Sequence, residues 1–113
     1  MQFADDLIDE VRAVFGNASQ MTEGTTSFVI VKGIQPLPGT EDERDVLLLP
    51  EPCDGYPSRL FFNSVILPQK RNWNGRRSFL ERDWYAFSWN GIEPAGQRPL
   101  TLIRQHLRPL VAP

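Results

Sequence analysis

Apolar residues near both ends of the chain recur at intervals of three or four, which is the spacing of an amphipathic helix. The N-terminal set predicts a helix over residues 3–15, and Gly16 suits its end. The C-terminal set predicts a closing helix, with Pro99 in its first turn and with its ideal geometry cut short at Pro109. The apolar positions are Phe3, Leu7, Ile8, Val11, Val14 and Phe15 in the first set and Leu100, Ile103, Leu107, Leu110 and Val111 in the second.

The middle of the chain has the pattern of strands instead. A polar, turn-prone stretch over 17–24 precedes β-branched and aromatic residues at 25–32, which predict a strand. Prolines, glycines and acidic residues separate it from apolar runs at 46–49 and 59–66, which predict two more strands. Loops rather than helices join these strands, so we expect an antiparallel meander.

Periodicity fails between residues 67 and 96, where large aromatic side chains alternate with polar and glycine-containing stretches. We therefore expect a long loop segment held down by its aromatic residues. The fold class predicted is α+β: an N-terminal helix, an antiparallel meander, a long aromatic loop segment and a C-terminal helix. Residues 1–113 should form a single domain.

Composition narrows the range of functions. The sequence is 41% hydrophobic, has no apolar run of membrane-spanning length and lacks the basic start of a secretory signal, so we expect a cytoplasmic protein. Residues 1–58 carry eleven acidic and three basic side chains, and residues 59–113 carry nine basic and three acidic ones. That asymmetry could steer a charged partner, unless folding interleaves the two halves.

Few residues support catalysis. No phosphate-binding glycine loop, dinucleotide motif or zinc-protease motif is present, and we expect no cofactor. Cys53 is the only cysteine and lies in a proline-bounded turn beside Asp54, which disfavours its thiolate. The only histidine, His106, is interpreted as a flank or surface residue rather than the base of a Cys/His pair. Acidic residues at 41–45 are interpreted as a solvated loop, because no spaced ligand pattern indicates a metal site.

One tract combines cations with aromatics. Residues 70–79 read Lys-Arg-Asn-Trp-Asn-Gly-Arg-Arg-Ser-Phe, a combination that serves phosphate attraction and base stacking in single-stranded nucleic acid. Arginines beside tryptophans equally stabilise loops or form protein interfaces, and the pI is about 5.3. A small nucleic-acid-binding domain is therefore the alternative hypothesis, and a protein-binding domain the favoured one.

The order of several short motifs resembles a known family. The Leu-Pro-Gly at 37–39, the Asp-Val-Leu-Leu-Leu-Pro run at 45–50 and the Gly-Tyr-Pro at 55–57 resemble the sheet of ubiquitin-conjugating enzymes. They are most similar to the bacterial conjugating-enzyme-like proteins of prokaryotic family E. The block at 82–90 is similar to that family's Trp-x-x-Trp-Ser block, and residues 100–107 resemble its terminal helix. The resemblance spans residues 1 to 111.

The chain also departs from that family. A conjugating enzyme carries its thioester cysteine after the Tyr-Pro strand, whereas no cysteine follows Cys53 here. Ser58 and its two successors replace the expected paired prolines, and Asn90 replaces a histidine. The resemblance therefore implies a non-catalytic scaffold that binds a ubiquitin-like protein or its activating enzyme, in a bacterial modification or phage-defence system that also holds a JAB-type peptidase. The partner-binding residues that we predict are Tyr56, Trp73, Arg76, Arg77, Trp89 and Asn90.

Overall fold

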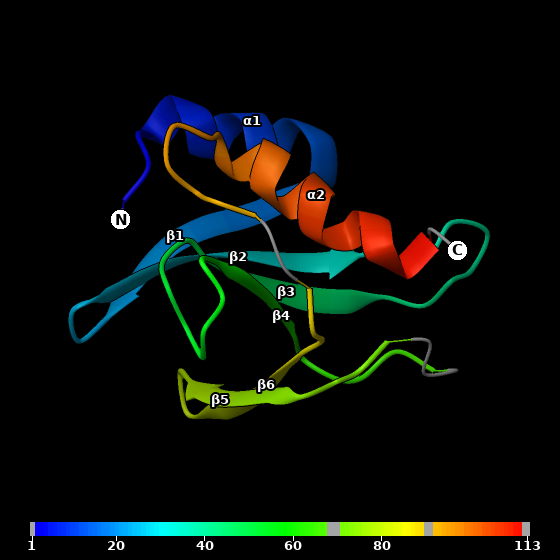
Figure 1. The fold of residues 1–113 in the computed structure, drawn as a ribbon. Coiled ribbons are helices and arrows are strands. Elements are labelled where there is room, and N and C mark those ends of the chain that lie inside the picture. The colour runs from blue at the N-terminus through cyan, green and yellow to red at the C-terminus, as the bar shows by residue number, and fades with distance from the viewer. Residues whose placement is uncertain (1, 68–70, 90–91, 112–113) are drawn as a thin grey trace.

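The computed structural model describes residues 2–67, 71–89 and 92–111, and over these it has an α+β architecture in three layers. Both helices lie on one face of a six-stranded antiparallel sheet of order β1-β2-β3-β4-β6-β5, and the β5–β6 hairpin turns beneath the other face (Figure 1). In chain order the elements are α1 (Asp5–Phe15), β1 (Asn17–Glu23), β2 (Thr26–Ile34), β3 (Arg44–Leu49), β4 (Arg59–Phe62), β5 (Gly75–Phe79), β6 (Arg82–Ala86) and α2 (Pro99–Val111).

The central strands are almost wholly apolar because both of their faces are covered. Successive side chains of a strand point to opposite faces, so Val29 and Val31 of β2 join the core under the helices, while Phe28 and Ile30 join the core above the hairpin. β3 and β4 divide in the same way. Burial on both faces removes the alternation of polar and apolar residues that a half-exposed strand would show.

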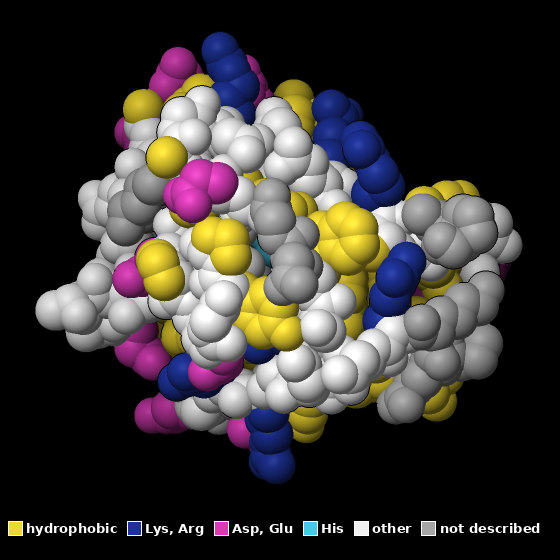
Figure 2. Space-filling view, viewed as in Figure 1, with side chains coloured by type: hydrophobic (Ala, Val, Ile, Leu, Met, Phe, Trp, Pro, Cys, Tyr) yellow, Lys and Arg dark blue, Asp and Glu magenta, His cyan; other side chains and the backbone are white. Residues whose placement is uncertain are grey.

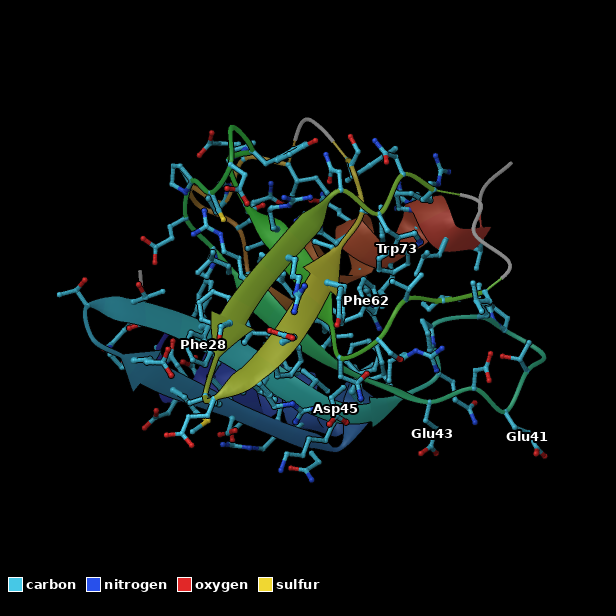
Figure 3. All side chains as sticks on the ribbon, turned by 90° about the horizontal axis from the view of Figure 1, so that it is seen from below. Phe28, Glu41, Glu43, Asp45, Phe62 and Trp73 are labelled. Atoms are coloured by element: carbon cyan, nitrogen blue, oxygen red, sulfur yellow. The ribbon has the colours of Figure 1, made fainter. Side chains whose placement is uncertain are left out.

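The β5–β6 hairpin forms the third layer. Trp84 is fully buried, and the ring of Phe79 lies 5.3 Å from that of Phe28, centroid to centroid. Figure 3 shows the two hairpin strands crossing the sheet, with Phe28 under their far end. At the hairpin turn the Leu80 amide donates to a carboxylate oxygen of Glu23 at 2.7 Å, which ties the turn to the opposite edge of the sheet.

The structure confirms the two terminal helices and the antiparallel sheet, and it corrects three details of the sequence prediction. Residues 17–23 form strand β1 rather than a turn-prone stretch; its polar composition reflects an edge strand that is exposed over most of its length. The segment 67–96 is not simply a loop, because it contains the β5–β6 hairpin. The third strand ends at Phe62 rather than at residue 66. Helix α2 contains Pro109 and ends at Val111, in agreement with the predicted C-terminal set.

The acidic and basic halves of the sequence interleave in space. Asp54 of the first half pairs with Arg77 of the second at 2.6 Å, and Glu10 of α1 pairs with Arg98 just before α2. Glu41 and Glu43 point away from the body of the protein, as a solvated loop predicts (Figure 3). Asp45 departs from that prediction, because it belongs to β3, accepts from the Gly33 amide at 3.1 Å and lies 3.6 Å from Arg82.

Candidate functional site

A tight turn at residues 53–56 carries the first of the predicted site residues. Cys53 and Tyr56 exchange two backbone hydrogen bonds of 2.9 and 3.0 Å, and Asp54 and Gly55 between them have φ angles of 55° and 87°. Two consecutive positive φ angles are what a two-residue type I′ turn requires, and Asp-Gly is a preferred sequence for it. The turn presents Asp54 and Tyr56 toward the base of the β5–β6 hairpin.

Arg59, at the start of β4, organises the side chains behind this turn. Its guanidinium lies 4.3 Å from the centroid of the Tyr56 ring and donates to Asn74 Oδ1 at 2.8 Å and to the Phe87 carbonyl at 3.3 Å. The side chain is only 3% exposed. A Cβ on Gly75 would come within 2.6 Å of Arg59 Nη1, so the close approach of β5 depends on glycine at that position.

The Tyr56 hydroxyl completes this network. Asn74 Nδ2 donates to it at 3.1 Å, and the Ser88 hydroxyl lies 2.8 Å away. These two hydrogen bonds, that of Ser88 first, lower the pKa of Tyr56. We call Asp54, Tyr56, Arg59, Asn74, Arg77 and Ser88 the Tyr56 cluster.

Two of the six members of this cluster were predicted as site residues, Tyr56 and Arg77. Arg77 reaches it through Asp54, whose Oδ1 accepts a hydrogen bond from Arg77 Nη2 at 2.6 Å. That hydrogen bond lowers the pKa of Asp54 and raises the pKa of Arg77. Sequence reasoning missed Arg59, and the signal that could have found it is a lone arginine opening an otherwise apolar strand.

The thiol of Cys53 is held in its protonated form. It is 9% exposed, and Sγ donates to Asp54 Oδ2 at 3.4 Å. Burial first, and then the hydrogen bond to the aspartate, raise the pKa of Cys53. Because the thiolate is the nucleophile in cysteine chemistry, this environment opposes covalent catalysis at neutral pH.

The prediction that His106 lies on a flank or at the surface is wrong. His106 is 3% exposed, and its Nε2 lies 3.0 Å from the hydroxyl of Ser58, which is itself 1% exposed. The Ser58 hydroxyl donates its single proton to the Ile92 carbonyl at 2.8 Å, so His106 Nε2 must donate to it. This direction is the reverse of a base activating a serine. Burial, and then the charge of Arg59, lower the pKa of His106 to about 4.

Cys53 and His106 do not form a catalytic pair. Cys53 packs in the core on the hairpin side of the sheet, whereas His106 belongs to α2 on the helix side. Among the residues that the structure describes, no group of three or more His, Cys, Asp or Glu side chains could hold a metal ion.

Trp73 and Arg76 are not members of the Tyr56 cluster. Trp73 is partly buried and packs edge-on against Phe62 and Phe87 at the margin of the core under the helices, with ring centroids 5.4 and 5.3 Å apart, and it lies next to Phe62 in Figure 3. Arg76 pairs with Asp83 across the hairpin at 2.7 Å. Asn90 and Lys70 lie outside the described residues.

Trp89 is half-buried and follows Ser88, which touches the Tyr56 hydroxyl. Its indole Nε1 is buried and has no hydrogen-bond partner among the described residues. The guanidinium of Arg71 lies 5.8 Å from the Trp89 ring centroid. We call Tyr56, Ser88 and Trp89 the Tyr56–Trp89 surface. Figure 2 shows hydrophobic side chains gathered near the middle of the face seen there, with basic ones on the side where α2 ends.

Comparison with known proteins found no match: no family model, no curated protein and no solved structure matches this chain. Within the described residues, no helix is long and apolar enough to cross a membrane.

Proposed function

We propose that this chain is a non-catalytic binding protein with a ubiquitin-conjugating-enzyme-like fold, which docks a ubiquitin-like protein or its activating enzyme in a bacterial modification or phage-defence system. The partner contacts the Tyr56–Trp89 surface. The identity of the fold and of the partner rests on the sequence resemblance. The geometry supports the proposal through the environment of Cys53, which opposes thioester chemistry.

The observation that carries the proposal is that the side chains able to act as nucleophile or base, Cys53, Ser58 and His106, are not in a reactive state. Burial and Asp54 hold the Cys53 thiol protonated, and the Ser58–His106 pair is enclosed and has its hydrogen bond in the wrong direction. Thioester exchange requires an accessible thiolate. We therefore propose that the chain binds its partner and does not transfer a ubiquitin-like protein through a thioester.

The Tyr56–Trp89 surface has the composition of a protein-binding site. Tyrosine and tryptophan are the side chains that most often dominate binding energy at interfaces. Here the Tyr56 hydroxyl is fixed by Asn74 and Ser88 before any partner arrives, so little side-chain entropy is lost on docking.

The nucleic-acid alternative draws less support from the structure. Arg76 and Arg77 are both paired with aspartates, and Trp73 packs into the core rather than offering its face to a base. Phosphate binding would have to compete with those two ion pairs, and base stacking would need another aromatic side chain.

The test is a binding and transfer experiment with the ubiquitin-like protein and activating enzyme of the same system. With ATP present, intact-mass spectrometry should show no reducible adduct on Cys53, and Cys53→Ser should bind its partner as the wild type does. A thioester on Cys53 would overturn the proposal. Salt-sensitive binding of single-stranded oligonucleotides without any protein partner would favour the alternative.

A further inference from the structure

A second candidate site lies on the hairpin side of the sheet and shares Asp54 and Arg77 with the Tyr56 cluster. A pocket of about 310 Å³ opens there between β2, β5 and the segment that follows β3. Thr26, Ser78 and Phe79 form one side of it, and Glu51, Cys53 and Arg77 are among the residues that form the rest. This volume is at the lower end of the range for small-ligand sites.

Glu51 is the unusual member of the pocket lining. Its Oε1 is buried and has no hydrogen-bond partner among the described residues, and no ion pair involving Glu51 occurs within them. Buried polar groups are almost always paired, because leaving one without a partner costs folding free energy. Oε1 itself is shut off from the pocket space, so a ligand reaches this carboxylate at its other oxygen, Oε2, for which no hydrogen bond occurs within the described residues.

The charges around Glu51 decide the kind of ligand. Arg77, the only basic residue among the described residues of the lining, donates to both carboxylate oxygens of Asp54, which Arg59 Nη1 also approaches at 3.4 Å. Both nearby cations are therefore held by Asp54, and Glu51 is the charged residue of the lining that has no ion pair within the described residues. Phe79 and the neighbouring Leu49 and Pro52 supply apolar surface for methylene groups.

We infer that this pocket binds an alkylammonium or guanidinium group, as carried by a lysine or arginine side chain, with Glu51 as its acceptor. The methylene stem packs on the apolar lining, and the cationic head reaches the carboxylate. The site is distinct from the Tyr56–Trp89 surface, and the inference does not require a ubiquitin-like partner.

The experiment is an NMR titration of the isotope-labelled chain with Nα-acetyl-lysine methylamide, n-butylamine and the neutral analogue Nα-acetyl-norleucine methylamide. The two cations should shift the amide signals of Thr26 and Ser78 in a saturable way in the millimolar range, and the neutral analogue should not. If the blocked lysine binds more tightly than butylamine, the ligand of the pocket is a side chain within a polypeptide. If the two bind equally, the ligand is a free amine. No saturable shift with either cation, or equal binding of the neutral analogue, overturns the inference.

Glu51→Gln is the decisive variant, because it keeps the shape and removes the charge. We expect it to weaken cation binding at least about tenfold. It should not lower the thermal midpoint, since no partner in the described residues stabilises this carboxylate. Glu81→Gln, at the exposed hairpin turn, is the matched control and should leave the titration unchanged. Unaltered cation binding by Glu51→Gln would contradict the assignment of the acceptor.

Discussion

The close approach between Gly75 and Arg59 can be tested through the stability of the protein. The Arg59 guanidinium is buried and fixed by the Phe87 carbonyl, Asn74 and the face of Tyr56. Arg59→Ala leaves the buried carbonyl unpaired, at about 1 to 3 kcal/mol, and removes a desolvated cation–π contact of roughly 2 kcal/mol. Relief of the desolvation of the charge offsets part of that loss, so we expect a net destabilisation of about 3 kcal/mol.

Gly75→Ala should disturb the same contacts from the other side. Its Cβ would lie 2.6 Å from Arg59 Nη1, and the guanidinium cannot retreat without breaking its hydrogen bonds. Overpacking of this kind costs about 1 to 3 kcal/mol. In the Arg59→Ala background the obstacle is gone, so Gly75→Ala should then be neutral or slightly stabilising, because alanine loses less backbone entropy than glycine.

Urea unfolding followed by tryptophan fluorescence measures all four corners of this double-mutant cycle. We expect a coupling energy of about 2 kcal/mol between the two sites, and a fall in melting temperature of roughly 12 °C for Arg59→Ala alone. Arg76→Ala serves as the control, because that arginine is exposed and should leave the unfolding midpoint unchanged. If Gly75→Ala costs the same free energy in both backgrounds, the guanidinium is not the obstacle and the reasoning is wrong.

Three further predictions concern single residues. His106 has a pKa of about 4 in the folded protein, against an ordinary 6.5, so the unfolded state takes up the proton first as the pH falls. The free energy of unfolding should therefore fall by about 1.4 kcal/mol for each pH unit from 6.5 down to 4. Urea unfolding of the wild type and of His106→Gln at several pH values should show this dependence only in the wild type. Cys53 should react with iodoacetamide at pH 7 at least about tenfold more slowly in the folded than in the urea-unfolded chain, because burial raises its thiol pKa, and equal rates measured by mass spectrometry would refute this. Trp73→Ala should destabilise the fold by about 3 kcal/mol, measured by thermal melting followed by circular dichroism, whereas an unchanged midpoint would mean that Trp73 is not part of the core.

The two helices could be predicted from the sequence because each has one apolar stripe at helical spacing, and the strands β2, β3 and β4 because they are short apolar runs between turn residues. The hairpin could not. The segment Gly75–Phe79 contains two arginines and a serine. It forms a strand only because it pairs with β6 and because its Phe79 packs against Phe28. Tertiary context of this kind overrides local propensity.

The candidate site was predictable only in part, for a similar reason. Tyr56 and Arg77 could be selected because aromatic and arginine side chains often mark interfaces. The contacts that join them run from Tyr56 to Arg59, from Arg59 to Asp54 and from Asp54 to Arg77, and they arise from three segments that meet only in the fold. The local sequence pattern also cannot predict that His106 is buried beside Ser58, because the two residues are 48 positions apart in the chain.

The central claim is that the chain binds a protein partner through the Tyr56–Trp89 surface. Isothermal titration of the ubiquitin-like protein and of the activating enzyme of the same system into the wild type, Trp89→Ala and the exposed control Glu81→Gln tests it most directly. We predict binding of one of the two proteins by the wild type, a loss of affinity of at least about tenfold in Trp89→Ala with the fold intact by circular dichroism, and no change in Glu81→Gln. Failure of the wild type to bind either protein, or equal affinity in Trp89→Ala, would contradict the account.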